Sequence, residues 1–353
     1  MADVLIRDFE PASDPPALDD LWMRVFGHPT GGQTIEWLFR DGPAGASPRA
    51  VAEADGRIVA HAGATALRFA LGGAVVRGGY SVAAMTDPAF RGQRLFYRVG
   101  EHLYRRMEEQ GFAFVAGFSN QNSFRLMTGP LRRTPVRPFP WCVRLLAPTA
   151  LVRAWLGRGA PPGPPDDAAA ERAIERVAEP GVRLALCAPG DARQDAIWAR
   201  AAEAVGVGAV RDAAFAAWRY GTRPDARYRL LLAEETGRPA GWLAYRGMAL
   251  RGVPAGFVVD LVLAPDADRA GRALLRAAAA LARAEGAALL SALRPGSGPA
   301  HRAMRRAGFV RVPEPVHPQL IRFSVRGLGA HAGDSALGAA RCWHLAWSDT
   351  DVV

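Results

Sequence analysis

YSVAAMTDPAFRGQRLFYRVGEHLYRRMEEQ, residues 80–110, is the stretch that decides the fold. It begins as a strand, turns at Asp87-Pro88, and continues from residue 95 to 110 as an amphipathic helix with one apolar face. The first amides of such a helix have no partner within it, and the helix dipole favours an anion beside them. Arg91 and Arg94 would add charge-assisted hydrogen bonds, and Gly92 allows a phosphate to approach the backbone closely. The stretch therefore predicts a diphosphate site between a strand and a helix.

The elements around this stretch predict a sheet made mostly of antiparallel strands. Two short helices, one beginning at 14–16 and one around Trp37, precede strands joined by Asp55-Gly56, a strong hairpin signal. A short buried strand at 112–120 follows the helix. We expect the strand VRPFPWCVRLL, residues 136–146, to complete the first unit.

A length of 353 residues favours two domains, and the same order of elements recurs in the second half. A Gly/Pro-rich stretch at 157–167 and a small helix after it predict a linker. We therefore predict a first domain at 1–147, a linker at 148–180 and a second domain at 181–330. Residues 331–353 are expected to be a tail packed on the domains, because two tryptophans, Trp343 and Trp347, seldom lie in a solvated tail.

Composition narrows the class of protein. The chain is 50% hydrophobic and 22% charged, which is typical of globular proteins. The net charge is +10, but the arginines are spread along the chain, so we expect no nucleic-acid partner. No leader sequence or spanning apolar run is apparent, and we expect a cytoplasmic protein without a membrane partner. Cys142, Cys187 and Cys342 match no metal spacing, so no metal is expected.

Residues 80–123 resemble the acetyl-CoA-binding core of the GNAT N-acetyltransferases, in which a strand runs into P-x-x-R-G-x-G-x-G/A and a helix. Pro88, Arg91 and Gly92 match this motif, whereas Arg94 and Phe96 replace its later glycines. The sequence FSNQNS at 118–123 is similar to the F-x-N-x-N-S element of one branch of that superfamily. The resemblance implies an α+β fold with two consecutive GNAT-like domains, each a central, mostly antiparallel mixed sheet flanked by helices.

The resemblance also implies how acetyl-CoA would bind as a co-substrate. The strand before the turn would offer backbone groups to pantetheine, the loop amides would hold the diphosphate, and an asparagine would bond the pantetheine. The residues implied are Ala84, Met85, Thr86, Arg91, Gly92, Gln93, Arg94, Leu95, Phe96, Asn120 and Asn122. The alternative role for the two asparagines is to cap the helix that follows them.

Acyl transfer to an amine needs a base for the amine proton and a proton donor for the leaving thiolate. GNAT enzymes commonly supply the donor as a tyrosine on the helix after the fifth strand, but Phe124 and Met127 stand in that region. Tyr80 and Tyr97 are possible substitutes. The residues predicted to be catalytic are Glu36, Tyr80 and Asn122, with Glu53 as another candidate base and His61 and His102 assigned to packing or solvent.

The second half resembles GNAT in outline only. Its turn keeps Pro265 and Gly271 but lacks the R-G-x-G loop, so we expect weak CoA binding there. Asp260 lies in the apolar run FVVDLVLA, and such a buried carboxylate either marks a site or forms an ion pair with an arginine such as Arg219 or Arg246. We predict that Asp260 and Trp37 contact the substrate.

These observations predict an N-acetyltransferase that moves an acetyl or other acyl group from acetyl-CoA to a primary amine by direct attack in a ternary complex. The acceptor is expected to be a small molecule, such as an amino sugar or metabolite, and the protein a monomer or homodimer. Two alternatives stay open: a catalytically impaired acyl-CoA-binding protein, and a Fem-like aminoacyl transferase that uses charged tRNA.

Overall fold

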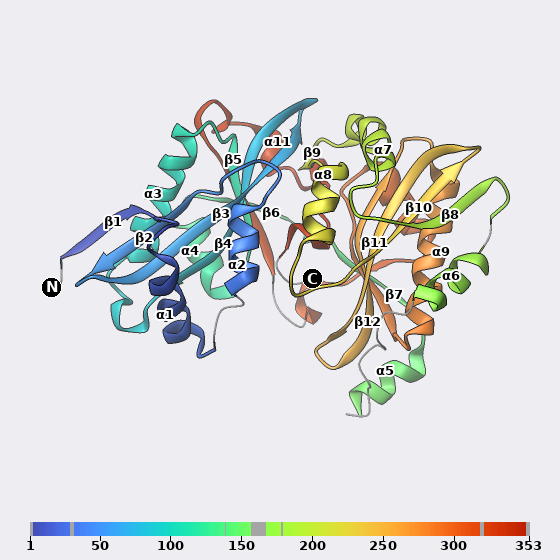
Figure 1. Cartoon of the computed structure of the whole chain (residues 1–353), viewed down its shortest axis with the longest axis horizontal. Coiled ribbons are helices and arrows are strands. Elements are labelled where there is room, and N and C mark those ends of the chain that lie inside the picture. The colour runs from blue at the N-terminus through green and yellow to red at the C-terminus, as the bar shows by residue number, and fades with distance from the viewer. Residues whose placement is uncertain are drawn as a thin grey trace.

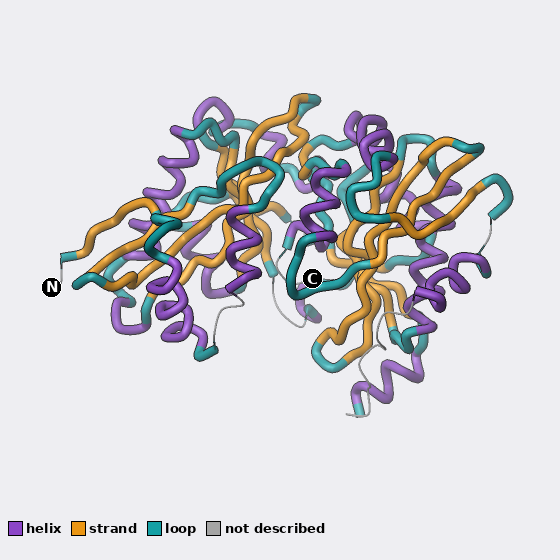
Figure 2. The backbone as a smooth tube through the Cα atoms, in the orientation of Figure 1, coloured by secondary structure: helices purple, strands orange, loops and turns teal. Residues whose placement is uncertain are grey.

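The computed structural model describes residues 3–28, 32–137, 139–156, 167–177, 179–317 and 321–350. It contains two mixed β-sheets flanked by helices, and the two sheets lie in the two halves of the molecule (Figures 1 and 2). The predicted α+β class is therefore confirmed. Most of the Gly/Pro-rich stretch assigned to the linker, residues 157–166, lies outside the described residues.

The first sheet has eight strands. Asp55 and Gly56 both have positive φ, at 50° and 70°, as the predicted two-residue hairpin turn requires. In sheet order the strands are β1 (Val4–Asp8), β2 (Arg49–Ala54), β3 (Arg57–Leu71), β4 (Ala74–Thr86), β5 (Phe114–Ser119), β15 (Arg322–Gly327) and β6 (Thr134–Val136), with β9 (Val207–Ala209) paired to β3.

The second sheet has seven strands and repeats the order of the first. Its parallel pair, β12 with β13, corresponds to β4 with β5 in the first sheet. In sheet order the strands are β14 (Val310–Arg311), β7 (Trp141–Leu145), β13 (Leu289–Leu293), β12 (Val253–Leu263), β11 (Arg238–Leu250), β10 (Arg229–Glu235) and β8 (Val182–Cys187).

The two halves exchange a strand, which corrects the expectation that the strand at 136–146 completes the first unit. β7 instead lies between β13 and β14 of the second sheet, and β15 lies between β5 and β6 of the first. An apolar strand pattern indicates burial but does not specify the neighbouring strand, so the sequence pattern could not assign these two strands to a sheet. Each sheet is incomplete without a strand from the other half.

Helices cover the sheets on both sides (Figure 1). α3 buries the predicted apolar face, Leu95, Val99, Leu103 and Met107, against one side of the first sheet. The helices are α1 (Pro15–Phe26), α2 (Gly32–Arg40), α3 (Leu95–Glu109), α4 (Gln121–Thr128), α5 (Pro148–Trp155), α6 (Asp167–Glu175), α7 (Arg193–Ala201), α8 (Ala213–Ala216), α9 (Asp268–Ala284), α10 (Gly298–Arg306) and α11 (Ser335–Gly338).

The C-terminal segment runs between the two halves of the molecule (Figure 1). Trp343 and Trp347 are buried in an apolar cluster that joins Phe69 and Phe114 of the first half to Phe257 of the second. The segment thus packs between the two domains and takes part in their common core. None of the helices in the described ranges combines the length and apolar character needed to cross a bilayer.

We predict that the chain unfolds in a single cooperative transition, because each sheet contains a strand of the other half. Val325→Ala on β15, a position only 1% exposed, should lower the free energy of unfolding by roughly 2 kcal/mol. Hydrogen exchange should show the same loss of protection in both sheets. The control, Val75→Ala at a position 64% exposed, should change stability by less than about 0.5 kcal/mol. Two separate calorimetric transitions, with Val325→Ala affecting one alone, would contradict the prediction.

Candidate functional site

β4 and β5 diverge at the place where the sequence predicts a ligand. They pair in parallel only at residues 78–80 of β4 and residues 114–116 of β5. β4 then carries a bulge opposite β3, with Ala83 at a φ of 52°. The divergence opens a cavity of about 250 Å³ between the strands, lined by residues 80–84 of β4, by Phe118 and Ser119 of β5, and by Asn120. We call this cavity the strand notch.

His61 of β3 fixes the bulge from the opposite strand. Its Nδ1 lies 2.7 Å from the carbonyl oxygen of Ala83, and Arg49 Nε lies 3.3 Å from its Nε2. Burial, together with the charge of Arg49, lowers the pKa of His61 to about 3. The neutral ring therefore donates from Nδ1 to Ala83 and accepts at Nε2 from Arg49. This contact agrees with the expectation that His61 packs against neighbouring residues.

The start of α3 carries amides that are free to bind an anion. The first helical bond runs from the amide of Arg98 to the carbonyl of Arg94, and within the described chain the amides of residues 92–97 have no recorded acceptor. Gly92 has a φ of 82°, and no atom lies within 4 Å of where its Cβ would be. Residues 91–94 are exposed. The loop is thus open to solvent, with its donors unpaired, as an anion site requires.

The equivalent helix of the second half is closed. At the start of α9 the amide of Ala270 donates to Glu235 Oε1 at 2.5 Å, and Asp268 adds a second carboxylate to the first turn. Carboxylates of the protein therefore lie where an anion would bind. This arrangement is consistent with the expectation of weak CoA binding in that half.

A second cavity of about 250 Å³ lies between the two halves, and we call it the inter-domain cavity. Trp37 on α2 and Trp218 after α8 both line it and stack on each other, with ring centroids 4.8 Å apart and planes 15° from parallel. Trp37 Nε1 also donates to Thr222 Oγ1 at 3.0 Å. The two segments that carry these tryptophans, one from each half of the chain, therefore meet face to face.

The two cavities share one wall. Trp22, Tyr80, Val82, Ala83, Asp349 and Thr350 line both of them. Tyr80 is buried, and its hydroxyl lies close to the carboxylate of Asp349. Burial and the nearby carboxylate of Asp349 raise the pKa of Tyr80 well above its ordinary value. A ligand in the strand notch and another in the inter-domain cavity would meet at this wall.

The residues predicted for catalysis are not all brought together. Glu36 lies 3.7 Å from Arg49 in an ion pair and lines neither cavity. Asn122 lies on the exposed side of α4 and also lines neither. Asn120 caps α4, with its Oδ1 accepting from the amides of residues 122 and 123. Tyr80 alone of the predicted catalytic residues reaches the shared wall.

The remaining predicted residues differ in where their side chains lie. Ala84 lines the strand notch, whereas the side chain of Met85 points into an apolar cluster with Leu18 and Leu21 of α1. Thr86 Oγ1 is buried without a partner in the described residues. The loop residues Arg91, Gly92, Gln93, Arg94, Leu95 and Phe96 surround the start of α3, where Leu95 is the buried anchor.

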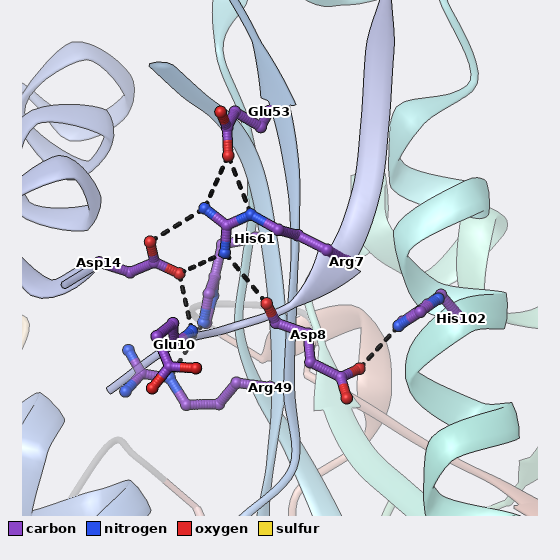
Figure 3. Close-up of polar contacts among 8 residues, drawn as sticks. All are labelled: Arg7, Asp8, Glu10, Asp14, Arg49, Glu53, His61 and His102. Atoms are coloured by element: carbon purple, nitrogen blue, oxygen red, sulfur yellow. Dashed lines mark hydrogen bonds and ion pairs between the residues drawn. The ribbon is translucent and has the colours of Figure 1, made fainter. Parts of the chain in front are cut away.

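The candidate base Glu53 and the histidine His102, which was assigned to packing or solvent, both form structural contacts around the first strands (Figure 3). Glu53 forms an ion pair with Arg7 at 2.7 Å, and His102 lies 2.7 Å from Asp8. Both contacts hold β1 in place. Neither Glu53 nor His102 lines the strand notch or the inter-domain cavity.

Asp260 is buried and forms an ion pair with an arginine, as the alternative interpretation expected, but the partner is Arg211 at 2.6 Å and neither Arg219 nor Arg246. It does not line the inter-domain cavity. Arg211 in turn pairs with Asp349 at 2.6 Å, and Asp349 does line it. Neither Arg211 nor Asp349 was predicted from the sequence. The only signal for Asp349 was its position shortly after the tryptophans that were expected to be buried.

Among the described residues, no group of three or more His, Cys, Asp or Glu is arranged to hold a metal ion. The three cysteines are unpaired and two of them are half-buried.

Comparison with known proteins identifies the class. The "Acetyltransferase (GNAT) domain" model matches residues 10–125, and the "Acetyltransferase (GNAT) family" model matches residues 195–309. No curated protein matches the sequence.

Similar solved structures include two bacterial proteins and one from yeast. A GCN5-related N-acetyltransferase from Anabaena variabilis has a TM-score of 0.60 at 10% identity, over 92% of this chain and 72% of that one. A probable N-acyltransferase from Enterococcus faecalis V583 has a TM-score of 0.58 at 11% identity, over 92% and 73%. N-myristoyltransferase from Saccharomyces cerevisiae with bound myristoyl-CoA has a TM-score of 0.56 at 11% identity, over 92% and 83%. At such identities the likeness is one of fold.

The two family models place the chain in the class of acyl-CoA-dependent N-acyltransferase folds. The chain belongs to the GNAT acetyltransferase family and contains two GNAT domains in tandem.

The contact of His61 with the bulge predicts a pH-dependent stability. Its pKa is about 3 in the folded state and 6.5 ordinarily, so between these values the unfolded chain binds the proton more readily. As the pH falls through this window, the native chain should lose up to about 1.4 kcal/mol per pH unit relative to His61→Gln. Urea unfolding of both proteins at several pH values measures the difference. A difference that stays constant with pH would show that His61 is not held neutral.

Proposed function

We propose that this protein is an N-acyltransferase that moves an acetyl or other acyl group from acyl-CoA, with acetyl-CoA as the expected donor, to the primary amine of a small molecule. The observation that carries the proposal is the meeting of two cavities at one wall. One cavity lies between the diverging strands beside the open start of α3, and the other lies between the domains. Such an arrangement suits direct attack within a ternary complex.

The donor would bind along β4 and the loop that follows. The amides of residues 92–97 would hold the diphosphate, with Arg91 and Arg94 adding charge-assisted hydrogen bonds. The backbone of residues 84–86 would bond pantetheine between β4 and β5. Asn120 would contact the pantetheine because it lines the strand notch. Its side-chain oxygen already caps α4.

The acceptor would lie in the inter-domain cavity. Its size of about 250 Å³ favours a small molecule over a polypeptide segment. Trp37 would contact the acceptor, because it lines the cavity and is held rigidly by its stack with Trp218. Asp260 would act indirectly, through Arg211, since neither residue reaches the cavity.

The unpaired amides and Arg91-Gly92 favour a diphosphate-bearing donor over the charged tRNA of a Fem-like transferase. An impaired acyl-CoA-binding protein would share the donor site but not transfer the acyl group. Phe124 and Met127 are buried on α4, the helix that commonly supplies the proton donor for the leaving thiolate. Because neither side chain can donate a proton, the impaired protein is the second candidate.

We predict that acetyl-CoA and CoA both bind and stabilise the chain, by about 2.7 kcal/mol at a hundred times the dissociation constant. Arg91→Ala should weaken binding about 10-fold or more, because a hydrogen bond to a charged group contributes about 1.5–3 kcal/mol. Arg269→Ala, in the first turn of α9 in the second half, is the matched control and should leave the affinity unchanged. Thermal shift and calorimetric titration measure these effects.

Release of free CoA thiol across a panel of primary amines then separates a transferase from a binding protein. No binding of either CoA species would contradict the donor site, and binding without transfer to any amine would favour the impaired protein.

A further inference from the structure

Three arginines and a histidine line a cavity of about 190 Å³ at one end of the second sheet. Arg294 follows β13, Arg311 ends β14, Arg341 lies in the C-terminal segment, and His301 lies on α10. We call it the arginine cavity. It shares no lining residue with the strand notch or the inter-domain cavity, and no described aspartate or glutamate lines it.

The charges of the three arginines are not balanced by the described part of the chain. Arg294, Arg311 and Arg341 form no ion pair or side-chain hydrogen bond with another described residue. Glu314, only three positions after Arg311, pairs with none of them. Positive groups around one cavity repel one another, and an anion bound among them would remove that repulsion.

Neighbouring arginines on α10 differ in this respect. Arg302 and Arg306 both form ion pairs with Asp268, at 3.7 and 2.8 Å. The chain therefore neutralises the arginines on one part of this helix and leaves those of the arginine cavity for a partner from outside. Arg294 is half-buried, whereas Arg311 and Arg341 are exposed, so a solute can reach all three.

Backbone contacts hold the three arginines in a fixed arrangement. The amide of Arg294 donates to the carbonyl of Pro140 at 2.9 Å, and β14 pairs with β7 at Arg311. Ser297 Oγ donates to the carbonyl of Arg341 at 3.2 Å. Three segments far apart in the chain are thus joined around one cavity. A ligand that binds to such a preformed site loses less of its affinity to the ordering of the protein.

The lining favours phosphate over other anions. A guanidinium group matches phosphate with two parallel hydrogen bonds, and three of them suit an anion with more than one negative charge. The volume is below the roughly 300–1,000 Å³ of a typical ligand pocket, which favours a small phosphate-bearing group. No phenylalanine, tyrosine or tryptophan lines the cavity to stack the bases of a nucleic acid.

His301 adds a group that can bind a phosphate in either protonation state. Its Nδ1 lies 2.8 Å from the carbonyl of Pro295 and donates to it, since a carbonyl oxygen only accepts. Nε2 then accepts when the ring is neutral and donates when it is protonated. A phosphate monoester has a pKa near 6 and can offer either a hydroxyl or an anionic oxygen to this nitrogen.

We propose that the arginine cavity is a binding site for a small molecule that carries phosphate groups. Arg294 and Arg311 hold the phosphate from the second sheet, and Arg341 holds it from the C-terminal segment. The ligand thereby ties this segment to the sheet, before the segment reaches the wall shared by the other two cavities. The site is separate from the proposed transfer reaction and does not depend on it.

Pyrophosphate is the probe, titrated by calorimetry at about 0.15 M salt, where charges more than about 8 Å apart are largely screened. All proteins carry Arg91→Ala, which weakens the loop before α3 as a competing site. Arg294→Gln and Arg341→Gln should each reduce the affinity about 10-fold or more, because each removes charge-assisted hydrogen bonds.

The matched control is Arg305→Gln on α10. This arginine is exposed and does not line the arginine cavity, so the substitution removes the same charge from outside the site. It should change the affinity less than about 3-fold. Without pyrophosphate, the melting temperatures of Arg294→Gln and Arg341→Gln should not fall, because repulsion is relieved. With pyrophosphate, hydrogen exchange should slow at residues 340–342.

Each other outcome overturns a defined part of the proposal. No binding of pyrophosphate, or binding that is unchanged by Arg294→Gln and Arg341→Gln, would overturn the site. Equal losses of affinity in these variants and in Arg305→Gln would show attraction to the overall charge alone. Citrate bound as tightly as pyrophosphate would overturn the phosphate class. A single-stranded oligonucleotide whose binding needs the same arginines would overturn the small ligand.

Discussion

The exchange of β7 and β15 between the two sheets is the constraint on which the rest of the structure depends. Each exchanged strand pairs on both sides, so neither sheet can be completed from its own half of the chain. The relative position of the halves is thereby fixed by backbone hydrogen bonds, and not only by side-chain packing. Because β15 lies in the first sheet, the residues after it are led back between the domains. The segment that carries Asp349 reaches the junction of the cavities for this reason.

The site follows from that arrangement in physical terms. The divergence of β4 from β5, held by the bulge at Ala83 and its contact with His61, creates space next to the unpaired amides of α3. The second half contributes Trp218 and Arg211, and its own helix start at α9 is closed by carboxylates. The tandem repeat therefore has divided roles, with one domain offering the anion site and the other forming a cavity wall.

Local features of the sequence predicted much of this. The hairpin at Asp55-Gly56, the apolar face of α3 and the open loop at Gly92 depend on residues close together in the chain, which is where pattern arguments are strongest. The strand exchange depends on pairing partners far apart in the chain, which an apolar pattern does not specify. Asp260 was found as a buried carboxylate, but its partner Arg211 and the next residue of the network, Asp349, are brought together only by tertiary structure.

The most direct test of the central claim is a crystal structure of the chain with a non-reactive acyl-CoA analogue. The account predicts the diphosphate within about 3 Å of the amides of residues 92–97. It also predicts the pantetheine between β4 and β5, with the acyl group at the wall shared by the two cavities. A diphosphate bound at α9, or a ligand that leaves the strand notch empty, would contradict it.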